Sequence, residues 1–301
     1  MYINHINKFT DAQAIQDALD AGTLANPYVA MTSAGTLDWN SLAPTPQVET
    51  RIKNTYRVSQ AEWESISGNP EEERTYPASY YNHGVLKAEM EDGTELEYQE
   101  GSGYFFPVTG AGDYVVYFTL SGDTIWGDEI EASEGLFAGV AGLKSSEIPE
   151  SINTVGYGAY SSGGLEAVVF PQHAMTIENA VFGGCYLTGA TIPADSVLSG
   201  YSFADIGQLE EVTFGRGVTI EVLQEGEGGA FMECPSLASI TFLGTTPPHI
   251  GAETFPWENR LQIHVPVGSE QAYATSFGTD TGMSFQVAGT GLIEVDPSPS
   301  E

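Results

Sequence analysis

Apolar residues recur in a fixed register over the C-terminal half of the chain. An aromatic residue occurs six times at intervals of 21 to 28 residues, a leucine follows five or six residues later, and another apolar residue comes four or five residues after that. This register predicts a repeat protein from about residue 125 to 275. The landmarks are Phe137, Leu143 and Ile148; Tyr160, Leu165 and Phe170; Phe182, Leu187 and Ile192; Phe203, Leu209 and Phe214; Phe231, Leu237 and Phe242; and Phe255, Leu261 and Val265.

Each repeat contains one segment with the alternation of a β-strand. The stretch LEEVTF (209–214) is an example, and it is rich in residues that favour strands. We expect a turn with an apolar–glycine pair such as Val155–Gly156 after the strand, and then a short helical or irregular return held by the aromatic. A unit of this size cannot bury its own apolar face, so we expect neighbouring units to stack and their strands to pair. Proline ends four of the strands, at Pro149, Pro171, Pro193 and Pro266.

The stretch IPESINTVGYGAYSSGGLEAVVFP (148–171) and its successors resemble the BspA-type leucine-rich repeat family. The resemblance implies a leucine-rich-repeat solenoid of about six units. The stretch TTPPHIGAETFPWENRLQIHVPVGSEQAYAT (245–275) looks like the terminal unit of such arrays in gut Bacteroidetes and their phages. Two features depart from the pattern: the insertion VLQEGEGGA (222–230) lengthens one repeat, and several repeats lack the usual cysteine.

The two cysteines, Cys185 and Cys234, occupy the same position in two repeats, three residues after the aromatic. One repeat lies between them, so stacked strands about 4.8 Å apart place equivalent positions roughly 9 to 10 Å apart. A disulfide needs Cα atoms within about 7 Å. We therefore predict two free, buried thiols that belong to the repeat core together with the landmark residues.

The first 124 residues show no such period. A short amphipathic helix is expected at 11–22 and a proline-bounded linker at 43–47. Strand-like runs follow between 48 and 120, including VLKAEM (85–90) and a hairpin at EDGTELEY (91–98). The segment that opens with NPYVAM (26–31) is similar to the start of virion proteins of Bacteroidetes-infecting, crAss-like phages, which implies docking residues Pro27, Tyr28, Val29 and Trp39.

These patterns predict a mainly β protein with four parts. A small α+β N-terminal docking module covers 1–45, and a β-rich middle domain covers 46–124. The leucine-rich repeats cover 125–275, and a C-terminal strand with a flexible acidic tail covers 276–301.

The charge of the chain excludes some partners. Its 41 acidic and 9 basic residues give a net charge of −32, so we expect neither nucleic acid nor an anionic membrane as a partner. The N-terminal stretch has no basic region followed by an apolar run, and no window approaches 18 apolar residues. We therefore expect neither a secretory signal nor a membrane span.

Catalytic and metal-binding motifs are not evident. The chain has no P-loop and no G-x-S-x-G motif. Oxygen donors cluster at 91–95 and 122–131 but do not fit an EF-hand loop. We expect no catalytic residue, cofactor or metal site. No zinc-type spacing relates the histidines, which are His5, His83, His173, His249 and His264.

These expectations favour a non-enzymatic structural and interaction protein of a phage particle, made in the host cytoplasm. A head fibre or capsid decoration protein is the first choice and a tail fibre the second. Its partners would be other virion proteins, further copies of itself as a trimer or dimer, and a host-surface glycan or protein, or mucus. Two alternatives stay open: a bacterial cell-surface adhesin with the same repeats, and a carbohydrate-active enzyme using a pair of carboxylates.

Overall fold

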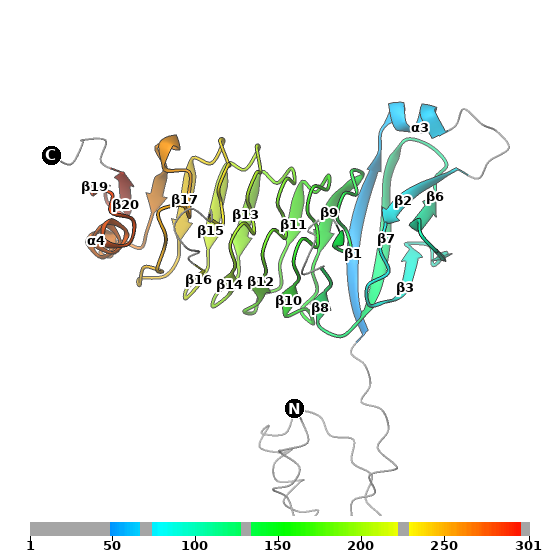
Figure 1. Ribbon diagram of the computed structural model, residues 1–301, viewed down its shortest axis with the longest axis horizontal. Coiled ribbons are helices and arrows are strands. Elements are labelled where there is room, and N and C mark those ends of the chain that lie inside the picture. The colour runs from blue at the N-terminus through cyan, green and yellow to red at the C-terminus, as the bar shows by residue number, and fades with distance from the viewer. Residues whose placement is uncertain (1–48, 67–73, 128–133, 222–228, 296–301) are drawn as a thin grey trace, which may run out of the picture. The chain divides into compact units, whose positions relative to one another are not determined.

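The computed structural model describes residues 49–66, 74–127, 134–221 and 229–295 (Figure 1). The chain divides into two compact units, Met1–Val48 and Glu49–Glu301, and all described residues belong to the second. The helix expected at 11–22 and the candidate docking residues Pro27, Tyr28, Val29 and Trp39 lie outside the described residues. No helix in the described ranges is long and apolar enough to cross a membrane.

The repeats form a β-solenoid with one long strand per repeat, as the sequence predicts (Figure 1). β9 pairs with β11 in parallel, and β13, β15, β17 and β18 pair in parallel in that order. Between β11 and β13, the Tyr186 amide donates to the Leu165 oxygen at 2.9 Å. The long strands are β9 (Leu143–Glu147), β11 (Ala167–Val169), β13 (Gly189–Ile192), β15 (Glu211–Phe214), β17 (Ser239–Phe242) and β18 (Gln262–His264).

A second parallel sheet of two-residue strands forms another side of the solenoid. The expectation of a turn at Val155–Gly156 was wrong for Val155, which lies in a strand of this sheet. Two residues are too few to show alternation, and they become a strand only because neighbouring repeats offer them main-chain partners. The strands are β8 (Thr124–Ile125), β10 (Thr154–Val155), β12 (Thr176–Ile177), β14 (Val197–Leu198) and β16 (Thr219–Ile220).

The six landmark aromatics form a continuous ladder inside the solenoid. Consecutive ring centroids lie 4.9 to 5.5 Å apart, close to the spacing of hydrogen-bonded strands. The Phe137 amide donates to the oxygen of Ala159, the residue before the next aromatic, and the Phe231 amide donates to Thr254 in the same way. The packing of the aromatic rings and the main-chain hydrogen bonds beside them therefore both recur once per repeat.

The tight corner after five of the six landmark aromatics uses a left-handed residue. The residue two positions after the aromatic has a positive φ of 53° to 71° in five repeats. Glycine adopts this conformation without strain, whereas other residues seldom do. The residues at this corner are Gly139, Ser162, Gly184, Asp205 and Glu233.

The N-terminal part of the described chain continues the solenoid instead of standing beside it. β1 (Glu49–Val58) pairs antiparallel with β7 (Gly112–Ser121) on one side and with β9 on the other. The segments 46–124 and 125–275 therefore share one sheet, with the strand order β11-β9-β1-β7-β3-β4. The hairpin predicted at 91–98 is confirmed, because β3 (Val85–Met90) pairs antiparallel with β4 (Glu95–Leu96).

A second sheet covers the inner face of this N-terminal part. It consists of β2 (Thr75–Ser79), β6 (Gly103–Pro107) and β5 (Tyr98–Gln99), and α3 (Gln60–Ile66) lies in the β1–β2 connection. Tyr56 packs on Phe106 with ring centroids 5.3 Å apart, and Phe118 packs on Phe137 at 5.0 Å. The aromatic ladder therefore continues into the N-terminal core.

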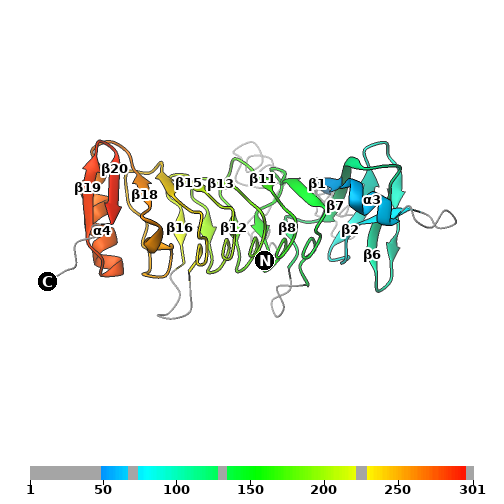
Figure 2. The same ribbon diagram turned by 90° about the horizontal axis from the view of Figure 1, so that it is seen from above.

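The C-terminal end of the solenoid is closed by a helix and a hairpin (Figure 2). The elements are the 3-10 helix η3 (Trp257–Asn259), α4 (Glu270–Thr281), β19 (Phe285–Gly289) and β20 (Leu292–Val295). β20 pairs antiparallel with β18, and Tyr273 and Phe277 of α4 pack on Phe242 at 5.4 and 5.7 Å. These contacts cover the last repeat, whose apolar face would otherwise be open to solvent.

Candidate functional site: the outer face of the long-strand sheet

The long strands present two rows of side chains on the outside of the solenoid. Alternate residues of each strand point into the core, and those between them point outward. One outward row contains Ala167, Gly189, Glu211, Ser239 and Gln262, and the next contains Val169, Thr191, Thr213, Thr241 and His264. Both rows are dominated by small and hydroxyl side chains.

A groove of about 800 Å³ lies on this face across β11, β13 and β15. Its floor includes Gly189, which has no side chain, and the small side chains of Thr191 and Thr213, so space remains above the sheet. Val169 and Leu243 also line it, and these two side chains are 57% and 53% exposed. Exposed apolar side chains beside an open groove are typical of a surface that binds something.

Two opposite charges lie at the two ends of one groove strand. Glu211 begins β15, and Arg216 follows two residues after its end. Neither side chain forms a salt bridge or a hydrogen bond with any part of the chain that the structure describes. The main chain of Gly215 lies so close to that of Ala194 that a Cβ atom at position 215 would overlap it. Glycine is therefore needed in the turn before Arg216. Both charges are therefore available to a partner.

An ion-pair ladder continues the same face from the groove towards the N-terminal strands. Lys144 lies 3.1 Å from Glu166, which lines the groove. Arg57 donates to Asp113 at 2.8 Å, and this hydrogen bond lowers the pKa of the Asp113 carboxyl. The ladder uses five of the nine basic residues of the chain, so this face is much less negative than the molecule as a whole. Its further pairs are Arg51–Glu89, Lys87–Glu89 and Lys53–Glu147.

The residues predicted for the repeat core lie inside the solenoid, and two of them, Phe170 and Ile192, also contribute to the lining of the groove. Each predicted core residue is buried, including Cys185 and Cys234, which are free thiols. Burial raises the pKa of Cys185 to about 12 and that of Cys234 to about 11. A thiol with so high a pKa stays protonated at neutral pH, which disfavours nucleophilic or metal-binding roles.

The histidines are dispersed. His173 contacts Glu150 and Asn153 at 3.1 and 3.0 Å, and His249 contacts Asp280 at 3.0 Å. Within the described ranges, no group of three or more His, Cys, Asp or Glu residues could hold a metal ion.

Residues 130–262 match the family described as BspA type Leucine rich repeat region, in six copies. The solenoid is similar to BspA-type leucine-rich repeats. The matched range contains β9 to β17 and every residue that lines the groove, and it does not reach the N-terminal segment. A search of curated proteins finds no match to the chain.

The sequence predicted the core of the leucine-rich repeats but not the groove on their outer face. Val169, Thr191 and Arg216 lie between the core landmarks, at positions where the residue type varies between repeats. The only available signal was an apolar residue at a position that alternation turns outward, as at Val169. An open groove of this kind suits recognition of a partner surface, as expected of a leucine-rich-repeat solenoid.

Proposed function

We propose that the protein is a non-enzymatic surface-interaction protein that binds its partner in the groove of the long-strand sheet. The observation that carries the proposal is the groove itself, with exposed Val169 and Leu243 beside small outward residues. Its two outward carboxylates do not resemble a glycosidase pair, because Glu166 is held by Lys144 and Glu211 is exposed at a strand end.

The groove favours an extended protein segment over a sugar chain. No exposed aromatic side chain lines it, although sugar rings are usually bound by stacking on such side chains. Apolar contacts to Val169 and Leu243 suit aliphatic side chains of a partner. Glu211 and Arg216 suit a segment with a basic residue near one end and an acidic residue near the other.

The test fills the groove without disturbing the core. Gly189 has no positive φ, and a Cβ atom there would meet only the flexible Glu211 side chain closely, at 3.3 Å from its Cγ. Gly189→Trp should therefore fold and block the groove. Gln262→Trp is the matched control, because it lies in the same outward row on β18, outside the groove.

Fluorescently labelled full-length protein would be titrated onto intact gut Bacteroidetes cells and mucin-coated wells. We expect Gly189→Trp to weaken binding at least tenfold, and Gln262→Trp to leave it unchanged. Protease treatment of the target should abolish binding, whereas periodate oxidation of glycans should not. Unchanged binding by a folded Gly189→Trp variant would refute the groove as the site.

We further propose that the protein is a component of a phage particle, either a head fibre or a capsid decoration protein, with a tail fibre as the next choice. The similarity of residues 26–44 to virion proteins supports it. The module at 1–45 would dock on capsid or tail proteins, and copies of the chain would assemble as a trimer or dimer.

Mass spectrometry of purified particles tests this placement. Peptides of the protein should co-purify with the capsid proteins at a fixed ratio. Their absence, or a lipoprotein signal upstream in the genomic reading frame, would favour the alternative of a bacterial cell-surface adhesin. Turnover of a polysaccharide that depends on one carboxylate pair would instead support a carbohydrate-active enzyme.

A further inference from the structure

The C-terminal strand β19 leaves one edge of the long-strand sheet open. It is the outermost strand in the order β18-β20-β19, and within the described ranges it pairs only with β20. Outside this pair, the main chain of Phe285–Gly289 forms no hydrogen bond with another described main-chain group. An edge strand directs alternate N–H and C=O groups away from its sheet. These groups of β19 are therefore available to a further strand.

This edge lacks the features that protect other sheet edges of the molecule. The edge strand β2 contains Pro77, and the edge strand β4 is two residues long and begins with Glu95. Proline, charge and short length all discourage pairing with another chain. The stretch SFQVAGTG (284–291) has neither a charge nor a proline. Its register with β20 shifts only after Val287, so the first half of the strand keeps regular ladder geometry.

An apolar side chain is exposed at this edge. Val287 lies two residues after Phe285 and therefore on the same face of the strand. Phe285 packs on Trp257 and Phe277, with ring centroids 5.4 and 5.9 Å apart. Val287 is 48% exposed. The packed face of the C-terminal cap therefore ends in a valine that another strand would cover.

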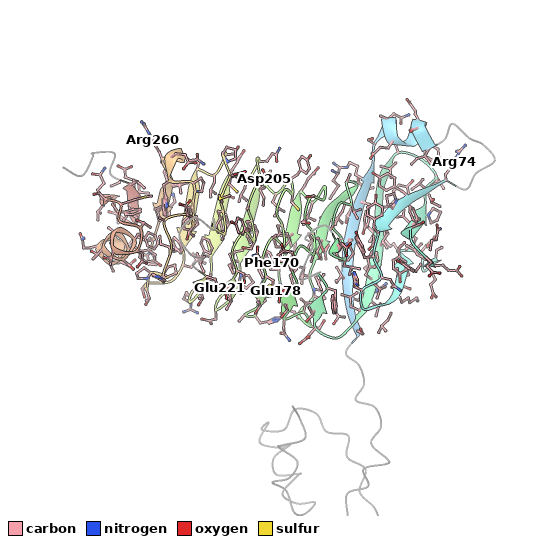
Figure 3. The ribbon with its side chains drawn as sticks, viewed as in Figure 1. Arg74, Phe170, Glu178, Asp205, Glu221 and Arg260 are labelled. Carbon is pink, nitrogen blue, oxygen red and sulfur yellow. The ribbon has the colours of Figure 1, made fainter. Side chains whose placement is uncertain are left out.

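Charge and position favour a second copy of the chain as the partner of β19. Two copies, each with a net charge of −32, repel when they lie side by side. Asp205 lies on one long edge of the solenoid, and Glu178 and Glu221 lie on the other (Figure 3). β19 instead lies at the C-terminal end of the described unit (Figures 1 and 2). A contact there sets one uncharged strand against another and keeps the two solenoids apart.

We propose that β19 pairs antiparallel with β19 of a second copy, so that two long-strand sheets join about a twofold axis beside Val287. An antiparallel pair of identical strands satisfies twofold symmetry. The contact gives the dimer form of the proposed assembly its surface, and it does not involve the groove on β11, β13 and β15. One pair of short strands buries less than the roughly 800 Å² per partner of a standard interface, so we expect a Kd of about 10 µM to 1 mM.

Sedimentation velocity of the full-length protein over this concentration range tests the contact. The parent should show a monomer–dimer equilibrium. Val287→Lys should raise the dimer Kd at least tenfold, because it sets two like charges against each other across the axis. Val169→Lys is the matched control, since it makes the same substitution at a valine that is 57% exposed on β11. It changes the net charge equally and should leave the dimer intact.

Cross-linking keeps the test decisive if Val287→Lys fails to fold. Both native cysteines are buried, so a short bismaleimide reagent should join two copies of Val287→Cys and leave Val169→Cys monomeric. A parent that is monomeric throughout, a trimer, a dimer unchanged by folded Val287→Lys, or equal cross-linking of the two cysteine variants would overturn the proposal. Val287→Lys should still bind target cells, and Gly189→Trp should still dimerise, so failure here is distinguishable from failure of the groove.

Discussion

The Cys185 thiol donates a hydrogen bond to the main-chain oxygen of Tyr160, with the sulfur 3.0 Å from the oxygen. The same bond joins Cys234 to Phe203 at 3.1 Å. In both cases the thiol reaches the landmark aromatic of the preceding repeat. The equivalent position holds Val140 in one repeat and Ile206 in another, so the thiol fills an apolar position and makes one weak additional bond.

Removing the Cys234 side chain beyond Cβ should destabilise the solenoid modestly. Cys234→Ala leaves a small cavity in a buried position and should lower the free energy of unfolding by about 1 to 2 kcal/mol. Cys234→Val is the matched control, and it should stay close to the parent because valine occupies this position at 140. Urea denaturation measures both. Partner binding should be unchanged, and its loss in a folded variant would assign the thiol a functional role.

Neither thiol should react while the protein is folded. Both are buried, and burial holds the pKa of Cys185 at about 12 and of Cys234 at about 11. At pH 8, 5,5′-dithiobis(2-nitrobenzoic acid) should label neither cysteine in the native protein and both in guanidinium chloride. Rapid labelling of one thiol under native conditions would contradict its placement in the repeat core.

The hydroxyls of Tyr160 and Ser146 are bonded to each other at 2.8 Å where the solenoid meets its N-terminal strands. Both residues are fully buried, and burial raises the Tyr160 pKa. Tyr160→Phe should cost about 1 to 2 kcal/mol, because it leaves the Ser146 hydroxyl without this partner. The double variant with Ser146→Ala should recover at least half of that loss in urea denaturation. An additive double variant would show that the two hydroxyls do not interact.

Some glycines are required by close approach of neighbouring repeats, and others are not. A Cβ atom at Gly164 would overlap the main-chain oxygen of Ala141, whereas one at Gly207 meets nothing within 4 Å. Gly164→Ala should therefore lower stability by about 1 to 3 kcal/mol or more, and Gly207→Ala should have little effect. Thermal unfolding of the pair measures this difference, and equal melting temperatures would contradict the tight packing at Gly164.

Acid should weaken the ion-pair ladder. Hydrogen bonding from Arg57 lowers the pKa of Asp113 below its unfolded value. A carboxyl with a depressed folded pKa stabilises the protein above the unfolded pKa, and this contribution is lost as pH falls through the folded pKa, below about pH 4. Asp113→Asn should therefore lose less stability than the parent between pH 5 and pH 2.5. The effect should be small and should shrink in 1 M salt, because the pair is exposed.

The sequence alone determined the repeats and their core. Phe182, Leu187 and Ile192, like their counterparts, recur in register because the same three positions of every repeat must face the interior. Free cysteines also followed from the sequence, since their separation in repeats excludes a disulfide. Such features depend only on residue type and period.

The tertiary structure decided the features that depend on neighbours in space. Val155 forms a strand only because β8 and β12 flank it, and β1 joins the solenoid only because β9 offers it an edge. The left-handed corner at Asp205 has no single residue signature, since only two of the five residues at this corner are glycine. The groove arises from outward residues of several repeats, whose grouping follows from the stacking of the strands and not from any one segment.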